Sequence, residues 1–112
     1  MKQILLDTNF IISCIKSKID FFDYIEGEGY SIVIPEQVIN ELEGLKKESA
    51  LRLLEKNKFN MISLKGKIVD NSIINYAKIN PSIIIATLDK ELQKNIKNRK
   101  MIIRNRKRLE II

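Results

Sequence analysis

The sequence predicts an α/β fold in which a mostly parallel sheet is covered by helices on both faces. Its short apolar runs, such as Ile4–Leu6 and Ile83–Ala86, are continuous, as in strands that are buried on both sides. Segments with helical spacing of apolar residues separate these runs, and strands that alternate with helices form parallel βαβ units. At 112 residues and 45% apolar content, we expect one domain, 1–112, with a real core.

Six short strands are expected where aliphatic and β-branched residues run together, because such side chains fit the buried surface of a sheet. They are Lys2–Leu6, Tyr30–Ile34, Phe59–Leu64, Ser82–Thr87, Met101–Arg104 and Leu109–Ile112. Gly27 and Gly29 mark the turn before the second run, and Asn80-Pro81 marks the break before the fourth. The fifth is expected to be the last parallel strand, and the sixth to be a short terminal one.

Six helices are expected where apolar residues recur three and four positions apart. They are Asn9–Lys16, Asp20–Glu26, Glu36–Leu45, Lys46–Lys56, Lys67–Lys78 and Lys90–Lys97. In the first of them Phe10, Ile11 and Cys14 share one side. Pro35 ends the second strand and suits the first turn of the next helix, because that turn needs no N–H from it.

Composition narrows the chemistry that this chain can perform. Its 20 Lys and Arg residues against 14 Asp and Glu give a net charge of +6, which favours nucleic acid first and an acidic membrane surface second as partners. Solubility alone remains an alternative explanation. Cys14 is the single cysteine and histidine is absent, which excludes internal disulfides, Cys/His zinc sites and Ser-His or Cys-His pairs. Hard oxygen ligands would instead suit Mg²⁺ or Mn²⁺.

The N-terminus has no secretory leader pattern, and the sequence has no run of 18 apolar residues. We therefore expect a cytoplasmic protein that does not bind a membrane.

Two aspartates stand at strand ends. Asp7 follows the apolar run Ile4–Leu6, and Asp89 lies two residues beyond the Ser82–Thr87 strand. In open α/β sheets ligands bind at the carboxyl ends of the strands, so both carboxylates are candidate metal ligands. Each one could equally be an N-cap, because Asp is a favoured capping residue.

Two further acids are expected to face inward from helices. On a helical wheel, Glu41 falls at the edge of the apolar stripe set by Val38 and Leu42, whereas Glu36 and Glu43 face solvent. A half-buried carboxylate is costly unless it is paired or binds a metal, and a salt bridge to a lysine is the alternative for Glu41.

Asp70 is expected to point in a similar inward direction at the first turn of its helix. It too could be a cap, and Asn71 could share that role. Clustered carboxylates repel unless a cation neutralises them, so four such acids at one sheet edge would indicate a divalent metal site suited to phosphodiester hydrolysis.

Four segments of the chain together resemble the PIN domain family, the metal-dependent nuclease fold of type II toxins and of ribosomal-RNA processing factors. These segments are Leu5–Asn9, Ile34–Leu42, Val69–Ala77 and Ile85–Leu92. The resemblance covers the chain in order and implies a three-layer α/β/α sandwich with a central, mostly parallel sheet. It also implies that the catalytic and metal-binding acids are Asp7, Glu41, Asp70 and Asp89.

The sequence departs from the family pattern at two positions. Asn71 stands where many relatives have a second acid, which would lower the charge of the site. Leu88 stands where relatives often carry a polar residue. Neither change removes one of the four acids, so we expect an active site.

The resemblance implies a mechanism for the four acids. Asp7 and Asp89 are expected to bind Mg²⁺ or Mn²⁺ directly, and Glu41 and Asp70 to complete the shell through waters. Thr8 and Thr87 are expected to orient a ligand or a water. Asn9 is expected to fix the turn after the first strand.

The sequence from Lys90 to the end contains nine basic residues and only two acids, Glu91 and Glu110. We interpret them as a track for RNA phosphates, with a solvated surface as the alternative. The expected contacts are Arg104, Arg106, Lys107 and Arg108.

Three functions follow in order of preference. The first is an endoribonuclease of ribosomal RNA processing, because the segment Ile102–Leu109 is most similar to the small-subunit rRNA-processing subgroup. The second is a VapC-like toxin ribonuclease held by an antitoxin, and the third is an RNA-binding PIN-like module without turnover, which Asn71 and Leu88 support. Family analogy also suggests a homodimer, and ribosome-assembly factors as partners in the first case.

Overall fold

The computed structural model describes the backbone of residues 2–66 and 69–112, and the side chains of these residues except at positions 69 and 70. Within this part of the chain, six strands form one sheet in the order β3-β2-β1-β4-β5-β6. The strands are β1 (Gln3–Leu6), β2 (Ser31–Pro35), β3 (Asn60–Ile62), β4 (Ile84–Ala86), β5 (Lys100–Arg104) and β6 (Arg108–Ile111). All neighbouring strands are parallel except β5 and β6, which are antiparallel.

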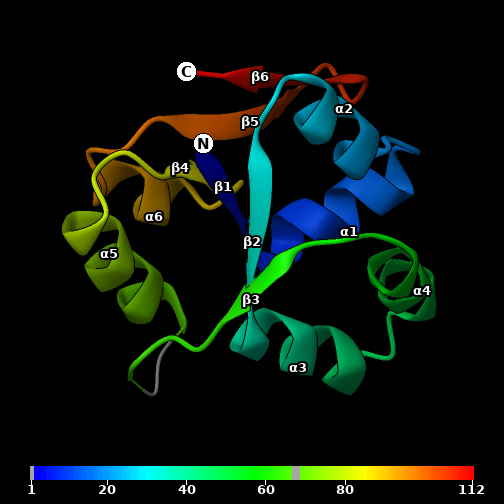
Figure 1. Ribbon diagram of the computed structural model, residues 1–112, viewed down its shortest axis with the longest axis horizontal. Helices are drawn as coiled ribbons and strands as arrows, with labels where there is room; N and C mark the ends of the chain where they lie inside the picture. Colours follow the sequence, from blue (N-terminus) through cyan, green and yellow to red (C-terminus); the bar gives the residue numbers. More distant parts are fainter. Residues whose placement is uncertain (1, 67–68) are drawn as a thin grey trace.

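Helices connect the strands and cover both faces of the sheet. They are α1 (Thr8–Lys16), α2 (Phe21–Gly27), α3 (Glu36–Gly44), α4 (Glu48–Lys56), α5 (Val69–Ile79) and α6 (Lys90–Lys94). Figure 1 shows α5 and α6 on one side of the sheet, and α1, α2 and α4 on the other. The expected three-layer α/β/α arrangement is therefore confirmed.

Alternation along the central strands creates two separate cores. Ile4 and Leu6 of β1 belong to the larger one, which packs against α1, α2, α3 and α4 through residues such as Phe10. Leu5, which points to the other face, belongs to the smaller core with Ile73 of α5. Because both faces of β1 are covered, its sequence is continuously apolar rather than alternating.

The topology reverses beside β1. From β1 the chain moves outward to β2 and β3, and then it returns to the other side of β1 to form β4 and β5. Ligands in open α/β sheets bind outside the carboxyl ends of the strands at such a switch point. Asp7 and Thr87 are the first residues after β1 and β4, so the sheet places both of them there.

The structure confirms the order and type of every predicted element and shortens several of them. The helix expected over Lys90–Lys97 ends at Lys94, because Asn95 caps it and Ile96 turns into the smaller core. The start expected at Lys67 for α5 lies outside the described residues. None of the helices in the described part is long and apolar enough to cross a bilayer.

Candidate active site

Asp7 is held in one orientation at the switch point. Its side chain is 6% exposed and caps α1, with Oδ1 accepting a hydrogen bond from the N–H of Thr8 at 2.8 Å. Oδ2 accepts a second hydrogen bond, at 2.9 Å, from the hydroxyl group of Thr87. The capping role is therefore confirmed, but it does not exclude a metal, because an ionised carboxylate has about four acceptor positions.

Glu41 joins the same group through Thr8. The hydroxyl group of Thr8 donates to Oε1 of Glu41 at 2.9 Å, which connects the start of α1 to α3. The expected half-burial of Glu41 is wrong, because the residue is exposed. A helical wheel gives the direction of a side chain from its helix, but not the position of that helix relative to the end of the sheet. Among the described residues, Glu41 has this hydroxyl partner and no ion pair with the lysine considered as an alternative.

Asp89 follows β4, which lies beside β1 on the side opposite to β2. It caps α6, and its Oδ1 accepts hydrogen bonds from the N–H groups of Glu91 at 2.9 Å and Leu92 at 3.2 Å. Its own N–H donates to the hydroxyl oxygen of Thr87 at 3.2 Å. Both capping hydrogen bonds end on Oδ1. Among the described residues, Oδ2 of Asp89 has no hydrogen-bond partner and could therefore bind another ligand.

The two threonines connect the acidic residues of the candidate site to one another. Thr8 connects Asp7 to Glu41, and Thr87 connects the carboxylate of Asp7 to the backbone N–H of Asp89, so one chain of hydrogen bonds joins three acidic residues from different parts of the sequence. The turn after β1 is fixed by the Asp7 cap rather than by Asn9, which is exposed in the first turn of α1.

The fourth predicted acid, Asp70, has its backbone in α5, but its expected inward direction lies outside the described residues. Asn71, next to it, is exposed. Among the described residues, no three acidic or sulfur-bearing side chains converge closely enough to enclose a metal ion. The donor chemistry nevertheless fits Mg²⁺ or Mn²⁺, because these ions prefer oxygen ligands, and Mg²⁺ in particular keeps several waters and needs few protein ligands.

One positioning side chain was missed in the sequence. Gln37 lies one helical turn before Glu41, and its amide makes two hydrogen bonds to the backbone of Leu64. Nε2 donates to the Leu64 carbonyl at 2.7 Å, and Oε1 accepts from the Leu64 N–H at 3.2 Å. This clamp fixes the segment after β3 against α3. The signal available in the sequence was the spacing of four between Gln37 and Glu41, which puts both on one helix face.

The predicted RNA contacts lie in the hairpin that joins β5 and β6. Arg104, Arg106, Lys107 and Arg108 are all exposed. Arg104 makes an ion pair across the hairpin, with 2.7 Å between its Nε and Oε2 of Glu110. The hydrogen bond from Arg104 lowers the pKa of the Glu110 carboxyl and raises the pKa of the guanidinium. Arg104 is thus partly engaged within the protein.

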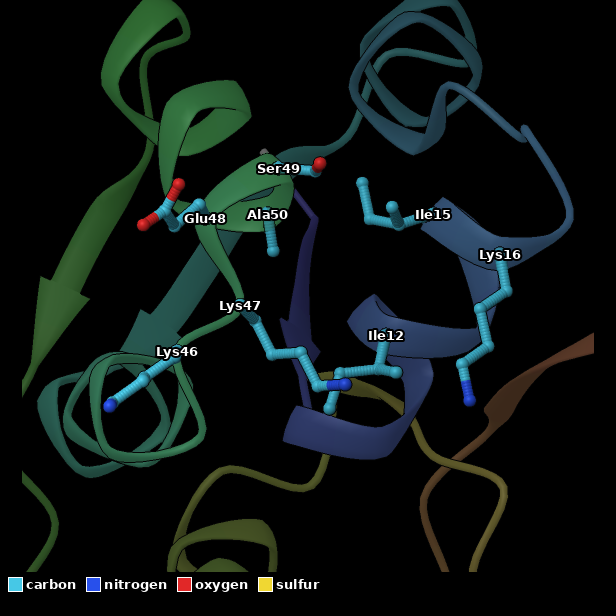
Figure 2. A pocket seen from close by; sticks show the side chains of 8 residues that line it. All are labelled: Ile12, Ile15, Lys16, Lys46, Lys47, Glu48, Ser49 and Ala50. Atoms are coloured by element: carbon cyan, nitrogen blue, oxygen red, sulfur yellow. The ribbon is translucent and has the colours of Figure 1, made fainter.

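A separate groove lies between α1 and the start of α4. Figure 2 shows apolar and basic side chains that line it, among them Ile12, Ile15 and Lys47. Its volume is about 320 Å³. The acid that lines it, Glu48, is none of the four predicted ligands. This groove therefore adds nothing to the chemistry of the candidate site.

Comparisons with known proteins agree with this geometry. Ribonuclease VapC4 of Methanocaldococcus jannaschii is 34% identical over 127 aligned positions, which cover 99% of this chain and 97% of that protein. The rRNA-processing protein fcf1 of Schizosaccharomyces pombe is 32% identical over 102 positions. That alignment covers 85% of this chain and 53% of fcf1, so the chain spans about half the length of this relative.

A solved structure, that of the PIN domain endonuclease Utp24, superposes with a TM-score of 0.83 at 26% identity. The superposition covers 97% of this chain and 90% of that one. The family model of the PIN domain matches residues 4–109. Because that match begins in β1 and ends in β6, it spans the whole sheet, and the chain belongs to the PIN domain family.

Proposed function

We propose that this protein is a metal-dependent endoribonuclease that hydrolyses phosphodiester bonds in RNA, and that its role is in ribosomal RNA processing. The observation that supports the chemistry best is the hydrogen-bonded chain from Glu41 through Thr8, Asp7 and Thr87 to Asp89. It connects the carboxylates of Asp7 and Glu41 to each other and to the backbone of Asp89, at the switch point of a PIN-domain sheet, where a ligand is expected.

Each carboxylate has a distinct part in this proposal. Asp7 and Asp89 would hold Mg²⁺ or Mn²⁺, and Glu41 and Asp70 would complete its shell through waters. When bound, the ion lowers the pKa of a water and stabilises the negative charge of the transition state. Asp70 enters through the family resemblance, since its side chain is outside the described residues.

The two threonines act as positioning residues. Thr87 keeps Oδ2 of Asp7 turned toward β4 and receives the N–H of Asp89, while its own carbonyl accepts a hydrogen bond from Nε2 of Gln93 at 2.7 Å. Side chains that are held in this way are preorganised, so less ordering is needed when a ligand binds.

A cleavage assay on single-stranded RNA tests the enzymatic proposal. RNA should be cut with Mn²⁺ or Mg²⁺ and remain intact with EDTA. RNA that is bound but never cut under any of these conditions would instead support the third function, a PIN-like RNA-binding module. Asn71 in place of a second acid and Leu88 before Asp89 are the features that favour that module.

The biological role has two candidates within the same chemistry. Ribosomal RNA processing is supported by the fcf1 and Utp24 similarities and would bring ribosome-assembly factors as partners. A toxin-like ribonuclease with an antitoxin partner is supported by ribonuclease VapC4, because the chain covers almost all of that relative. A homodimer is compatible with either role.

Mapping of cut sites on total RNA separates the two roles. Cells that lack the protein should accumulate uncut rRNA precursors if it processes rRNA. Cuts in other RNAs, together with growth arrest on overexpression, would favour the toxin-like role.

A further inference from the structure

A cleft between α1 and the β5–β6 hairpin opens beside the candidate active site. We propose that it binds an unpaired nucleotide of the RNA strand, next to the phosphate that is cut. This proposal rests on the ribonuclease function and adds a place for the substrate. The cleft has a volume of about 530 Å³, and its seven lining residues are Ser13, Lys16, Ser17, Leu88, Ile103, Asn105 and Arg106.

The chemistry of this lining suits a nucleotide. Lys16 and Arg106 supply positive charge, and the lining residues include no carboxylate. Leu88 and Ile103 are half-buried and pack on the larger core, so they offer an apolar surface against which a base can lie. The hydroxyl groups of two serines add hydrogen-bonding capacity for a sugar or phosphate.

The cleft adjoins the acids through the chain itself. Leu88 stands between Thr87, which positions Asp7, and Asp89, which caps α6. A base in contact with Leu88 would therefore touch the residue that directly links Thr87 to Asp89 in the chain. That adjacency is why we assign the cleft to the strand being cut rather than to a distant part of the RNA.

Lys16 reaches the cleft from the end of α1. Figure 2 shows its side chain extending away from Ser49 and Ala50 of α4, on the side where β5 runs. It lines the cleft together with Ile103 of β5, which agrees with that direction. Lys16 of α1 and Arg106 of the β5–β6 turn thus line the same cleft, where both charges can attract the phosphates of an RNA strand.

Arg106 occupies a backbone position that normally favours glycine. The turn from Arg104 to Lys107 has a hydrogen bond from the Lys107 N–H to the Arg104 carbonyl, and both central residues, Asn105 and Arg106, have positive φ, 54° and 57°. Asn-Gly is the favoured pair for such a turn. The chain has arginine instead, and the guanidinium is on the residue that lines the cleft.

An unpaired strand fits this cleft better than a duplex. Sequential bases of a single strand can turn their faces to apolar side chains, whereas in a duplex the faces are stacked on one another. An acidic peptide would pair with the two cations, but its carboxylates would make no use of the apolar surface of Leu88 and Ile103. Single-stranded RNA is therefore the occupant that suits this cleft.

Two variants and two matched controls test the proposal by fluorescence anisotropy with a short single-stranded RNA in EDTA, where no cleavage occurs. Arg106→Gly removes the cation and suits the turn, so the protein remains folded. Lys18→Gly is its control, because Lys18 also has a φ of 57° and is exposed, but does not line the cleft. Lys16→Met keeps the apolar stem and is matched by Lys97→Met, at an exposed position outside the cleft.

Arg106→Gly and Lys16→Met should each weaken RNA binding several-fold more than their controls. Each should also reduce the slope of log affinity against log salt concentration by about 0.7. Equal effects of variant and control would overturn the proposal. So would duplex RNA that competes as well as the single strand, or polyglutamate that displaces RNA as effectively, which would indicate an acidic peptide site.

The experiments distinguish a failure of the nucleotide site from a failure of the proposed ribonuclease function. If the cleft variants bind RNA normally while Mn²⁺-dependent cleavage requires Asp7, the ribonuclease proposal stands and the nucleotide site fails. If RNA is bound through Lys16 and Arg106 but is never cut with any metal, the nucleotide site stands as an RNA-binding site and the ribonuclease proposal fails.

Discussion

Thr87 donates a hydrogen bond from its hydroxyl group to Oδ2 of Asp7, over 2.9 Å, although the two residues are 80 positions apart in the chain. The same hydroxyl oxygen accepts a hydrogen bond from the N–H of Asp89. One hydroxyl group therefore contacts the carboxylate of Asp7 and the backbone of Asp89, and its removal should affect the position of both residues.

Thr87→Val should keep the shape of the side chain and lose these two hydrogen bonds. We expect metal affinity or cleavage to fall by about 10- to 100-fold, as when partners of metal ligands are removed. The measurement is the cleavage rate over a range of Mn²⁺ concentrations. Thr87→Ser keeps the hydroxyl group and should stay near the wild-type rate. A valine variant that matches wild type at low Mn²⁺ would remove Thr87 from the positioning role.

Asp7→Asn should abolish metal-dependent RNA cleavage and leave the protein folded. Asparagine is as good an N-cap as aspartate, so the start of α1 is kept, while the negative charge and the acceptor of the Thr87 hydrogen bond are lost, at a cost in stability of about 1–2 kcal/mol. Circular dichroism and a cleavage assay measure the two effects. Asp20→Asn makes the same change at the cap of α2, which is exposed, and should keep full activity. Unchanged cleavage by Asp7→Asn would contradict the site assignment.

Gln37→Met should release the segment that follows β3. The side chain keeps its length but loses both hydrogen bonds to Leu64, at a cost of about 1–2 kcal/mol. Hydrogen exchange should speed up at the Leu64 amide beyond any global change, because that N–H loses its acceptor. Asn57→Ala, which removes one side-chain hydrogen bond to Leu53, is the control and should leave exchange at Leu64 unchanged. Equal exchange in the two variants would mean that the clamp does not hold this segment.

Cys14 should make the fold less stable at alkaline pH. The thiol is fully buried, and burial raises its pKa to about 12, whereas an exposed thiol has a pKa of about 8.5. Between these values the unfolded state loses the proton and the native state keeps it. The contribution is thus complete below about pH 8.5 and is lost as the pH rises toward 12, with a slope of up to about 1.4 kcal/mol per pH unit.

Urea unfolding from pH 7 to 11 measures this contribution. Other groups titrate in the same range, so the comparison is with Cys14→Ala, which lowers stability through its cavity but should show a flatter dependence on pH. Parallel curves for the two proteins would rule out the thiol as the cause. In the native state at neutral pH, iodoacetamide should label Cys14 very slowly.

The fold was predictable because its signals are local. Continuous runs such as Ile83–Ala86 indicate strands buried on both faces, and the spacing of Phe10, Ile11 and Cys14 indicates a helix without reference to any distant residue. The end of α6 was not predictable in this way. Ile96 leaves the helix because a core formed by α5 and the sheet lies beside it, and that core exists only in the folded chain.

The site was predictable in part for the same reason. Strand ends pointed to Asp7 and Asp89, and the structure brings both to Thr87. The bond from Thr8 to Glu41 depends on how α1 and α3 pack, and nothing near either residue in the sequence reveals it. The ion pair of Arg104 with Glu110 likewise depends on the register of the β5–β6 hairpin.

Asp7 and Asp89 each begin a helix and each stand among the proposed ligands. A helix start accepts aspartate, asparagine or serine almost equally, whereas a divalent cation needs the charge. Substitutions at these two positions therefore differ in whether they affect the metal site alone or the helix start as well. A variant that loses RNA cleavage can keep the helix start through asparagine or serine, but alanine removes the cap as well, so inactivation would come with a loss of stability of about 1 kcal/mol.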